Sequence, residues 1–423
     1  MRHYKSYITM ALAACTLFFV SCSDEYMESM NTDPSKADTI DPNAQLTTAQ
    51  LHTYGDLEVS ETYRSYIYAF NQQLMGCWNT TNYGGRHTLD LNEMGHIWQN
   101  YYLKNIKDLT DAQARTMDDE EKVNINAAVR IYRVYLMSHL TDIYGDVPYF
   151  EAGKGFIDGK FTPRYDTQEE IYNDFFAELD AAVTAFDGTK DRITGDVIYN
   201  GDINKWKKFA NSLRLRLAMR VSNVDPDLAK EQAQAALDAQ NGGVLETSNE
   251  TVGQYGIRNP LGGVSGWGEV FMNASLESFL KGYDDPRLKS YFSAAQDGRD
   301  NDGNITQTVA GVKQLTSIEG KFKGVRQGTG VGDNRYSTHS RTTITTSSKI
   351  IVMAAAEVWF LRAEAALRGF TSEDVESCYK QGVTTSFAQW DASGVSEYLE
   401  SENTPADYVD TFLSLIHISE PTR

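Results

Sequence analysis

The residues best suited to ligand chemistry are aromatic side chains that lie among turn-forming residues rather than on helical stripes. Trp78 and Tyr83 occur in a stretch rich in Asn, Thr and Gly, where a ring contributes little to a hydrophobic core. An aromatic side chain in a loop can stack on the C–H face of an uncharged ring in a ligand, while neighbouring polar side chains form hydrogen bonds with the hydroxyl groups of that ligand. The candidate ligand-binding residues are Trp78, Asn79, Asn82, Tyr83, Arg86, Tyr255, Trp267 and Tyr336.

Each of these rings could instead fill space beneath a long loop, so the alternative for every single residue is a packing role. Trp206, Trp359 and Trp390 differ because they fall on predicted helix faces, where we expect core positions.

Motifs for catalysis or metal binding are scarce. Neither HExxH, GxSxG nor a P-loop occurs, and Asp297–Asn304 lacks the spacing of an EF-hand calcium loop. Carboxylates are abundant, so a glycosidase-type pair stays open. We predict a non-enzyme with no cofactor and no metal. Cys77 and Cys378 are too far apart for a disulfide framework, so we expect two buried thiols.

The charge of the chain excludes one class of partner. A net charge of -19 and a pI of about 4.8 oppose binding to nucleic acid. After the N-terminus, no run of about 18 apolar residues occurs, so no spanning helix is expected.

The N-terminus has the pattern of a bacterial export signal. Basic residues precede the apolar stretch Ile8–Val20, and Ser21-Cys22 follows. We interpret residues 1–21 as a signal peptide, Cys22 as a lipidated first residue and residues 22–44 as a flexible tether. Secretion without a lipid is the alternative.

The remaining chain predicts helices that pack in pairs. From Ile125 to Ile143 apolar residues recur every three or four positions, and Gly145 and Pro148 stop the helix. Thr167 and Glu170 form a predicted capping box. Further helices are expected at 46–76, 97–116, 171–186, 205–221, 227–240, 349–368 and 375–390, with a long irregular region at 244–347.

Four stretches together resemble the SusD/RagB family of nutrient-binding outer-membrane lipoproteins. They are Thr141–Ala152 (TDIYGDVPYFEA), Trp206–Arg220, Tyr283–Phe292 and Lys321–Gly324, the last expected as a small strand. The resemblance implies a mainly α fold, a tetratricopeptide-like superhelix of helical pairs with long irregular loop insertions, in one domain over residues 45–412. The sequence shows no strict self-similarity at about 34 residues, so the repeat rests on the resemblance.

The same resemblance implies a function. It predicts a surface-exposed, lipid-anchored outer-membrane protein that binds a nutrient oligomer, a glycan or a peptide, and delivers it to a SusC-like TonB-dependent transporter. The alternatives are a helical-repeat interaction scaffold without glycan binding and a glycoside hydrolase.

Residues 413–423 read LSLIHISEPTR, the in-frame translation of a transposase sequencing adapter. We interpret this segment as non-native, and we expect the natural sequence to continue beyond Phe412.

Overall fold

A computed structural model describes residues 40–55, 57–254, 256–266, 269–297, 308–313, 316–317, 321–329 and 339–401. The chain divides into the units Met1–Asp41 and Pro42–Arg423, and all elements below belong to the second. Cys22, Tyr255, Trp267, Tyr336 and the segment 413–423 lie outside the described residues.

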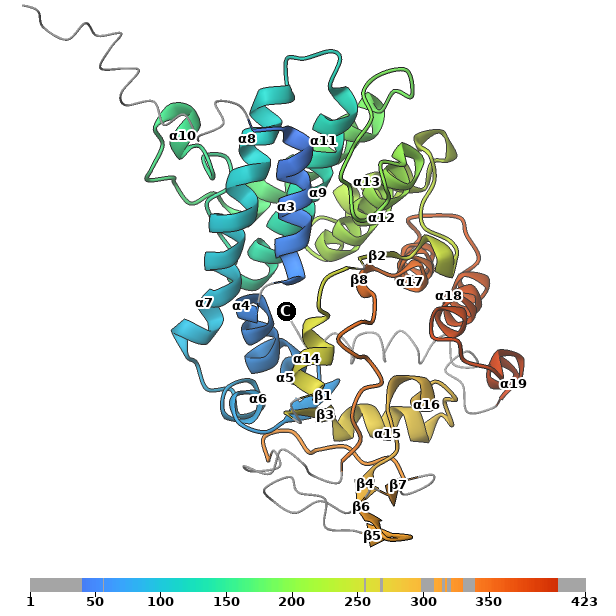
Figure 1. Cartoon of the computed structure of the whole chain (residues 1–423). Coiled ribbons are helices and arrows are strands. Elements are labelled where there is room, and N and C mark those ends of the chain that lie inside the picture. The colour runs from blue at the N-terminus through green and yellow to red at the C-terminus, as the bar shows by residue number, and fades with distance from the viewer. Residues whose placement is uncertain are drawn as a thin grey trace, which may run out of the picture. The chain divides into compact units, whose positions relative to one another are not determined.

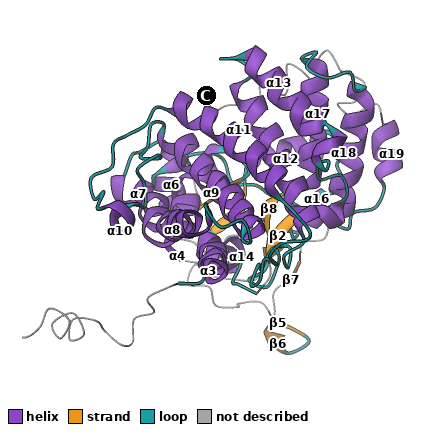
Figure 2. Cartoon of the chain, turned by 90° about the horizontal axis from the view of Figure 1, so that it is seen from above, coloured by secondary structure: helices purple, strands orange, loops and turns teal. Residues whose placement is uncertain are grey.

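The second unit is built mainly from helices that pack in sequence order. Successive neighbours are α3 with α8, α8 with α9, α9 with α11, α11 with α12, α12 with α13 and α17, and α17 with α18. Figure 1 shows this array, and Figure 2 shows α7 and α8 on one side of it and α17 to α19 on the other. The helices are α3 (Pro42–Gly55), α4 (Leu57–Thr62), α7 (Leu91–Asn100), α8 (Lys107–Thr116), α9 (Val123–Tyr144), α11 (Gln168–Ala185), α12 (Ile203–Val221), α13 (Pro226–Leu237), α17 (Ala355–Leu367), α18 (Val375–Gln389) and α19 (Val395–Glu400). The prediction of a mainly helical, paired array is confirmed.

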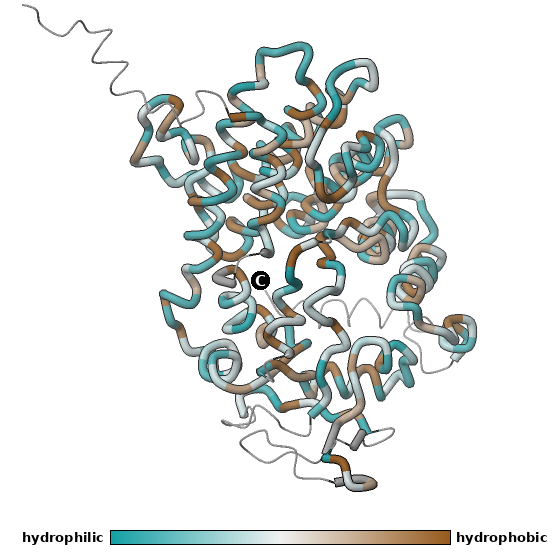
Figure 3. Tube along the Cα trace, viewed as in Figure 1, coloured by the Kyte–Doolittle hydropathy of each residue, from teal (hydrophilic) through white to brown (hydrophobic). Residues whose placement is uncertain are grey.

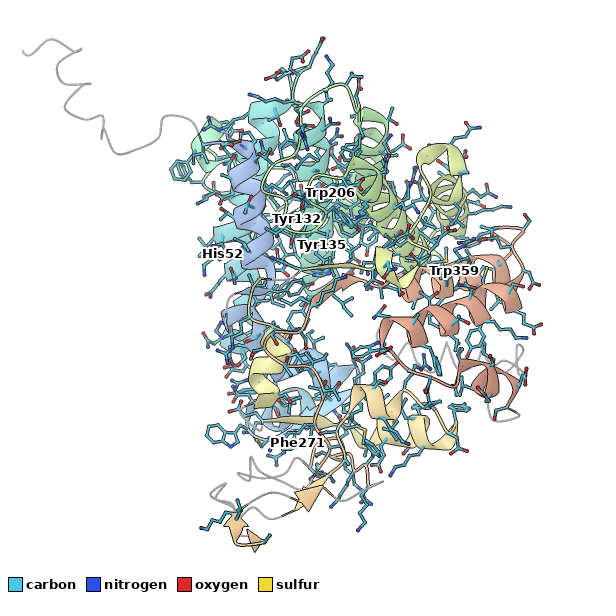
Figure 4. The ribbon with its side chains drawn as sticks, turned by 45° about the vertical axis from the view of Figure 1, so that its right-hand side comes forward. His52, Tyr132, Tyr135, Trp206, Phe271 and Trp359 are labelled. Atoms are coloured by element: carbon cyan, nitrogen blue, oxygen red, sulfur yellow. The ribbon has the colours of Figure 1, made fainter. Side chains whose placement is uncertain are left out.

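Helix α9 is the central helix, as its periodicity predicts. It is buried on nearly every side, and Gly145 ends it with φ 77°, a conformation that favours glycine. In Figure 4, Tyr132 and Tyr135 of α9 lie together with Trp206 of α12 between the helices. Trp206 is fully buried, as expected, and its Nε1 donates to the Asp196 carboxylate at 2.8 Å.

The other predicted core tryptophans are only partly buried. Trp359 donates from Nε1 to the Glu246 carbonyl at 2.7 Å, and Trp390 packs edge-on against Tyr291. The predicted capping box of α11 is present in full, with Thr167 and Glu170 satisfying each other's backbone N–H groups. Cys77 and Cys378 are both buried as thiols.

The first two predicted helices have wrong boundaries. Helix α3 begins at Pro42, so residues 42–44, expected in the tether, are helical. The helix expected at 46–76 is instead α3, α4, a π-helical segment η1 (Tyr63–Ile67), α5 (Tyr68–Phe70) and a strand β1 (Leu74–Gly76). The helix expected from 97 begins at Leu91, because the Asp90 side chain caps it by accepting from the N–H groups of Asn92 and Glu93. It then runs through a π segment, η3 (Tyr101–Ile106), into α8.

Two further expectations are wrong in the C-terminal half. Residues 350–353 form a strand, β8 (Ile350–Met353), which pairs antiparallel with β2 (Val252–Gln254), so the helix expected from 349 starts at Ala355. The β-branched run at 350–352 suits a strand better than a helix. Lys321–Gly324 is not a strand, and only the adjoining Val325 forms an isolated bridge to Asn273.

The irregular region contains short elements with small cores of their own. They are β3 (Val270–Met272), β4 (Gln296–Asp297), β5 (Thr308–Val309), β6 (Val312–Lys313), β7 (Thr316–Ser317), α14 (Pro260–Gly266), α15 (Ala274–Gly282) and α16 (Leu288–Tyr291). One small core joins Leu74, Val270 and Leu280, and another joins Met75, Phe271 and Val325. Figure 4 shows Phe271 well apart from the group around Trp206.

Candidate ligand-binding face

A short antiparallel ladder positions the loop that carries most of the candidate residues. Strand β1 pairs with β3, with Gly76 opposite Val270, and Cys77 then donates its backbone N–H to the Glu269 carbonyl at 3.1 Å. Gly76 permits this approach, because a Cβ there would lie 1.8 Å from the Glu269 oxygen. The chain therefore leaves the ladder at a fixed point directly before Trp78.

Trp78 has an unusual backbone conformation, with φ 54° and ψ -123°, and 41% of the residue is exposed. A bulky residue at positive φ is a rare outlier that costs on the order of 1–3 kcal/mol. The next turn, α6 (Asn79–Asn82), holds it in place, since the N–H of Asn82 donates to the Trp78 carbonyl at 2.8 Å. The fold therefore spends conformational free energy to hold a large ring at the surface, as is common at functional sites.

Tyr83 offers a second ring beside it in the chain. It is half-buried and stacks on Tyr66, with centroids 5.9 Å apart and planes 30° apart. Burial raises the pKa of Tyr83, and the Asp90 and Glu93 carboxylates raise it further. The hydroxyl therefore stays protonated at neutral pH and can both donate and accept a hydrogen bond.

Arg86 links this loop to a distant segment. Its Nη1 lies 3.4 Å from Asn82 Oδ1, and its Nε lies 3.4 Å from the Gly328 carbonyl. Asn82 and Arg86 are exposed, and Asn79 is half-buried. Together with Trp78 and Tyr83, five of the eight predicted residues belong to this one loop, residues 78–86.

Polar residues at 72–73 and 326–328 extend this surface, and sequence reasoning missed them. The Asn273 N–H donates to the Gln73 carbonyl at 3.0 Å, and Asn273 Nδ2 donates to Gln327 Oε1 at 2.9 Å. Gln73 is exposed and Gln327 half-buried, so both offer amide groups. The polar run Asn71-Gln72-Gln73 was the available signal. We call the surface formed by residues 71–73, 78–87 and 326–329 the ligand face.

Backbone strain concentrates on the ligand face. Seven described residues other than glycine have positive φ, and three of them are Gln72, Trp78 and His87. His87 also stacks on Phe70, with centroids 5.5 Å apart.

A pocket of about 1010 Å³ lies elsewhere, between α9, α11, α12, α13 and α17. Its charged groups largely satisfy one another. Arg216 forms two hydrogen bonds to Glu357, at 2.6 and 2.8 Å, and Arg220 pairs with Asp142 at 3.2 Å. Two arginines of α12, Arg214 and Arg216, are largely buried, because their side chains are only 8% and 15% exposed. Arg216 and Arg220 lie so far in sequence from Glu357 and Asp142 that the sequence alone could not predict these ion pairs.

Within the described ranges, no group of three or more His, Cys, Asp or Glu residues is placed to hold a metal ion. The same ranges contain no helix with the length and hydropathy needed to cross a membrane.

Known proteins resemble this chain closely. A solved structure of a Bacteroidetes AC2a SusD-like protein is 30% identical and has a TM-score of 0.73, with 85% of this chain and 81% of that chain covered. A chitin-binding protein is 32% identical, with a TM-score of 0.73 and coverage of 85% and 79%. A chitin-binding SusD homolog from Flavobacterium johnsoniae is 27% identical, with a TM-score of 0.70 and coverage of 84% and 73%.

A search among curated proteins found no match. The family model described as "Susd and RagB outer membrane lipoprotein" matches residues 38–420, nearly the whole chain. This chain therefore belongs to the SusD-like family of outer-membrane lipoproteins.

Proposed function

We propose that this protein is a surface-exposed lipoprotein that binds a neutral oligosaccharide on the ligand face and delivers it to a SusC-like TonB-dependent transporter. The observation that carries the proposal is Trp78, a large exposed ring held in a costly backbone conformation. A packing role would not require the ring to be exposed at that cost.

The chemistry of the ligand face suits a sugar. Rings of Trp78 and Tyr83 can stack on the C–H faces of pyranose units. The amides of Gln73, Asn82 and Gln327 can pair with hydroxyl groups in both directions, because each amide carries donors and an acceptor. Because these amides are uncharged, they can bind a neutral ligand without the large free-energy cost of removing a charged group from water.

Chito-oligosaccharides are the first cargo to test, because two similar structures are of chitin-binding proteins. A peptide cargo is the alternative, and a panel of glycans and peptides distinguishes the two.

Trp267, Tyr255 and Tyr336 lie outside the described residues and stay predictions from sequence alone.

The proposal assigns binding rather than catalysis, and it places a lipid on Cys22. Mass spectrometry of the protein from membranes tests the anchor: an acyl-modified Cys22 is expected, and an unmodified N-terminus at that position contradicts it.

Calorimetric titration with chitohexaose and a panel of neutral oligosaccharides tests binding. Trp78→Ala should raise the Kd for the glycan about tenfold or more, which corresponds to a loss of about 1.4 kcal/mol of binding free energy. Tyr165→Ala, which removes a 64% exposed ring outside the ligand face, is the matched control and should leave affinity unchanged.

Two outcomes would replace the proposal. Capture of the transporter with no affinity for any glycan or peptide would indicate a scaffold. Release of new reducing ends from a bound glycan would indicate a glycoside hydrolase.

A further inference from the structure

A loop between α9 and α11 exposes an unusual amount of apolar surface. Its four apolar residues are Phe156 and Ile157 in the short helix α10 (Gly155–Asp158), and Phe161 and Tyr165 after it. They are 86%, 42%, 74% and 64% exposed, respectively. Figure 3 shows hydrophobic positions on α10 at the edge of the array. Soluble surfaces rarely gather aromatic side chains in this way without a partner.

The charged side chains that point outward from this loop are mainly basic. Arg164 is 59% exposed and Lys160 is 45% exposed. Arg164 pairs at 2.7 Å with Asp166, which is itself sealed from solvent, so the carboxylate lies beneath the arginine rather than beside it. Lys160 pairs with the less exposed Glu151 at 3.1 Å. Asp158, at the end of α10, is an exposed acidic residue of the same loop.

This composition is typical of segments that enter a lipid interface. Phe and Tyr rings partition into the boundary between headgroups and acyl chains, while Lys and Arg extend toward phosphates. We call residues 154–165 the interface loop.

The interface loop and the start of the folded body are held by the same turn of α8. Asp111 accepts a hydrogen bond from Gln45 Nε2 in the first turn of α3, at 2.7 Å. The adjacent Thr110 donates from Oγ1 to the carbonyl of Ala152, just before the loop, at 3.2 Å. Figure 1 shows α10 and the start of α3 at the same end of the array.

This placement matters because the proposed lipid anchor joins the body at Pro42. A flexible linker of about 20 residues has an end-to-end distance of about 25 Å and cannot exceed about 70 Å. An anchor on Cys22 would therefore hold this end of the body close to the bilayer.

We propose that Phe156, Ile157, Phe161 and Tyr165 insert into the outer surface of the lipid bilayer and orient the body on the membrane. The proposal rests on the proposed lipid anchor for its direction, but its chemistry can be tested without the anchor. Lipid anchors alone permit free rotation, so a second contact would fix the direction in which the ligand face points.

The test uses a chain that begins at Ser23 and so lacks any acyl group. All described elements begin at Pro42 or later, so this removal leaves the described contacts intact. The probe is a vesicle of phosphatidylethanolamine and lipopolysaccharide, the lipid class that faces outward in a bacterial outer membrane, and binding is measured by co-sedimentation. The parent chain should bind, and Phe156→Ser/Phe161→Ser should lower its partition coefficient by about tenfold or more.

The matched control is Leu89→Ser/Leu91→Ser. These leucines are 69% and 78% exposed, and Leu91 starts α7, roughly 25 Å along the helical axis from Thr110. The control should bind vesicles like the parent. Failure of the parent to bind, or equal loss in both variants, would overturn the proposal.

Two further measurements distinguish membrane insertion by the interface loop from glycan binding on the ligand face, and from a protein partner on the interface loop. Chitohexaose titration of the Phe156→Ser/Phe161→Ser variant should match the parent, and Trp78→Ala should still bind vesicles. A parent that ignores vesicles but loses transporter capture or self-association with the Phe156→Ser/Phe161→Ser change would identify a protein partner and reject the lipid.

Discussion

The helical array and the ligand face use the same residue types in opposite ways. In the array, Trp206, Tyr132 and Tyr135 are fully buried, and each polar atom of Trp206 has a partner. On the ligand face, Trp78 is exposed and its backbone is strained. Aromatic rings stabilise the array by burial, whereas the exposed ring on the ligand face contributes less to stability and is the one we propose for recognition.

The largest expected effect is on the array side of this comparison. Trp206→Ala should lower the free energy of unfolding by about 3–5 kcal/mol, because it leaves a cavity and removes a donor to Asp196. Trp78→Ala should lower it by less, about 1–2 kcal/mol, because 41% of Trp78 is already exposed. Denaturant titration of both variants measures the difference, and similar losses would erase the distinction between the two regions.

A smaller effect concerns the pH dependence of the array. His139 of α9 lies edge-on to Tyr135, with ring centroids 4.5 Å apart. Burial lowers the pKa of His139 to about 3, and Arg216 and Arg220 lower it further. Below about pH 6.5 the unfolded chain gains a proton that the folded chain does not, so this contribution to stability is lost as pH falls toward 3.

The wild type should therefore lose about 2 kcal/mol more stability between pH 7 and pH 5 than His139→Gln. Burial raises the pKa of the nearby Asp142, so the contribution of Asp142 to stability increases as pH falls. This contribution is the same in the wild type and in His139→Gln, so it cancels in the comparison. Parallel pH profiles for the two proteins would show that His139 is protonated in the folded state.

The smallest effect tests the strain at the ligand face. Trp78→Gly should be more stable than Trp78→Ala by about 1–2 kcal/mol, since only glycine adopts this conformation without strain. Both variants should lose glycan affinity. Equal melting temperatures would mean that position 78 is not strained.

The sequence predicts elements whose signals are local. The stripe of α9 and the pair Thr167 and Glu170 each lie within one helix, and the structure confirms them. Where two signals compete, sequence reasoning is less reliable: the apolar run at 350–353 fits a helix or a strand, and pairing with β2 decides it.

Contacts between distant segments could not be predicted in this way. Strand β1 pairs with β3, which is almost 200 residues away in sequence, and Arg216 pairs with Glu357, which is 141 residues away. No local sequence pattern predicts either contact. The candidate residues at 78–86 could be selected by type and context, but the strain at Trp78 depends on the β1–β3 ladder and is visible only in the fold.

A crystal structure of the protein with chitohexaose, or with the tightest-binding glycan of the panel, tests the proposed binding mode most directly. We predict a sugar ring stacked on Trp78, with hydroxyl groups near the amides of Gln73, Asn82 or Gln327. A glycan bound in the pocket beside Arg216 and Arg220, with Trp78 uncontacted, would contradict it.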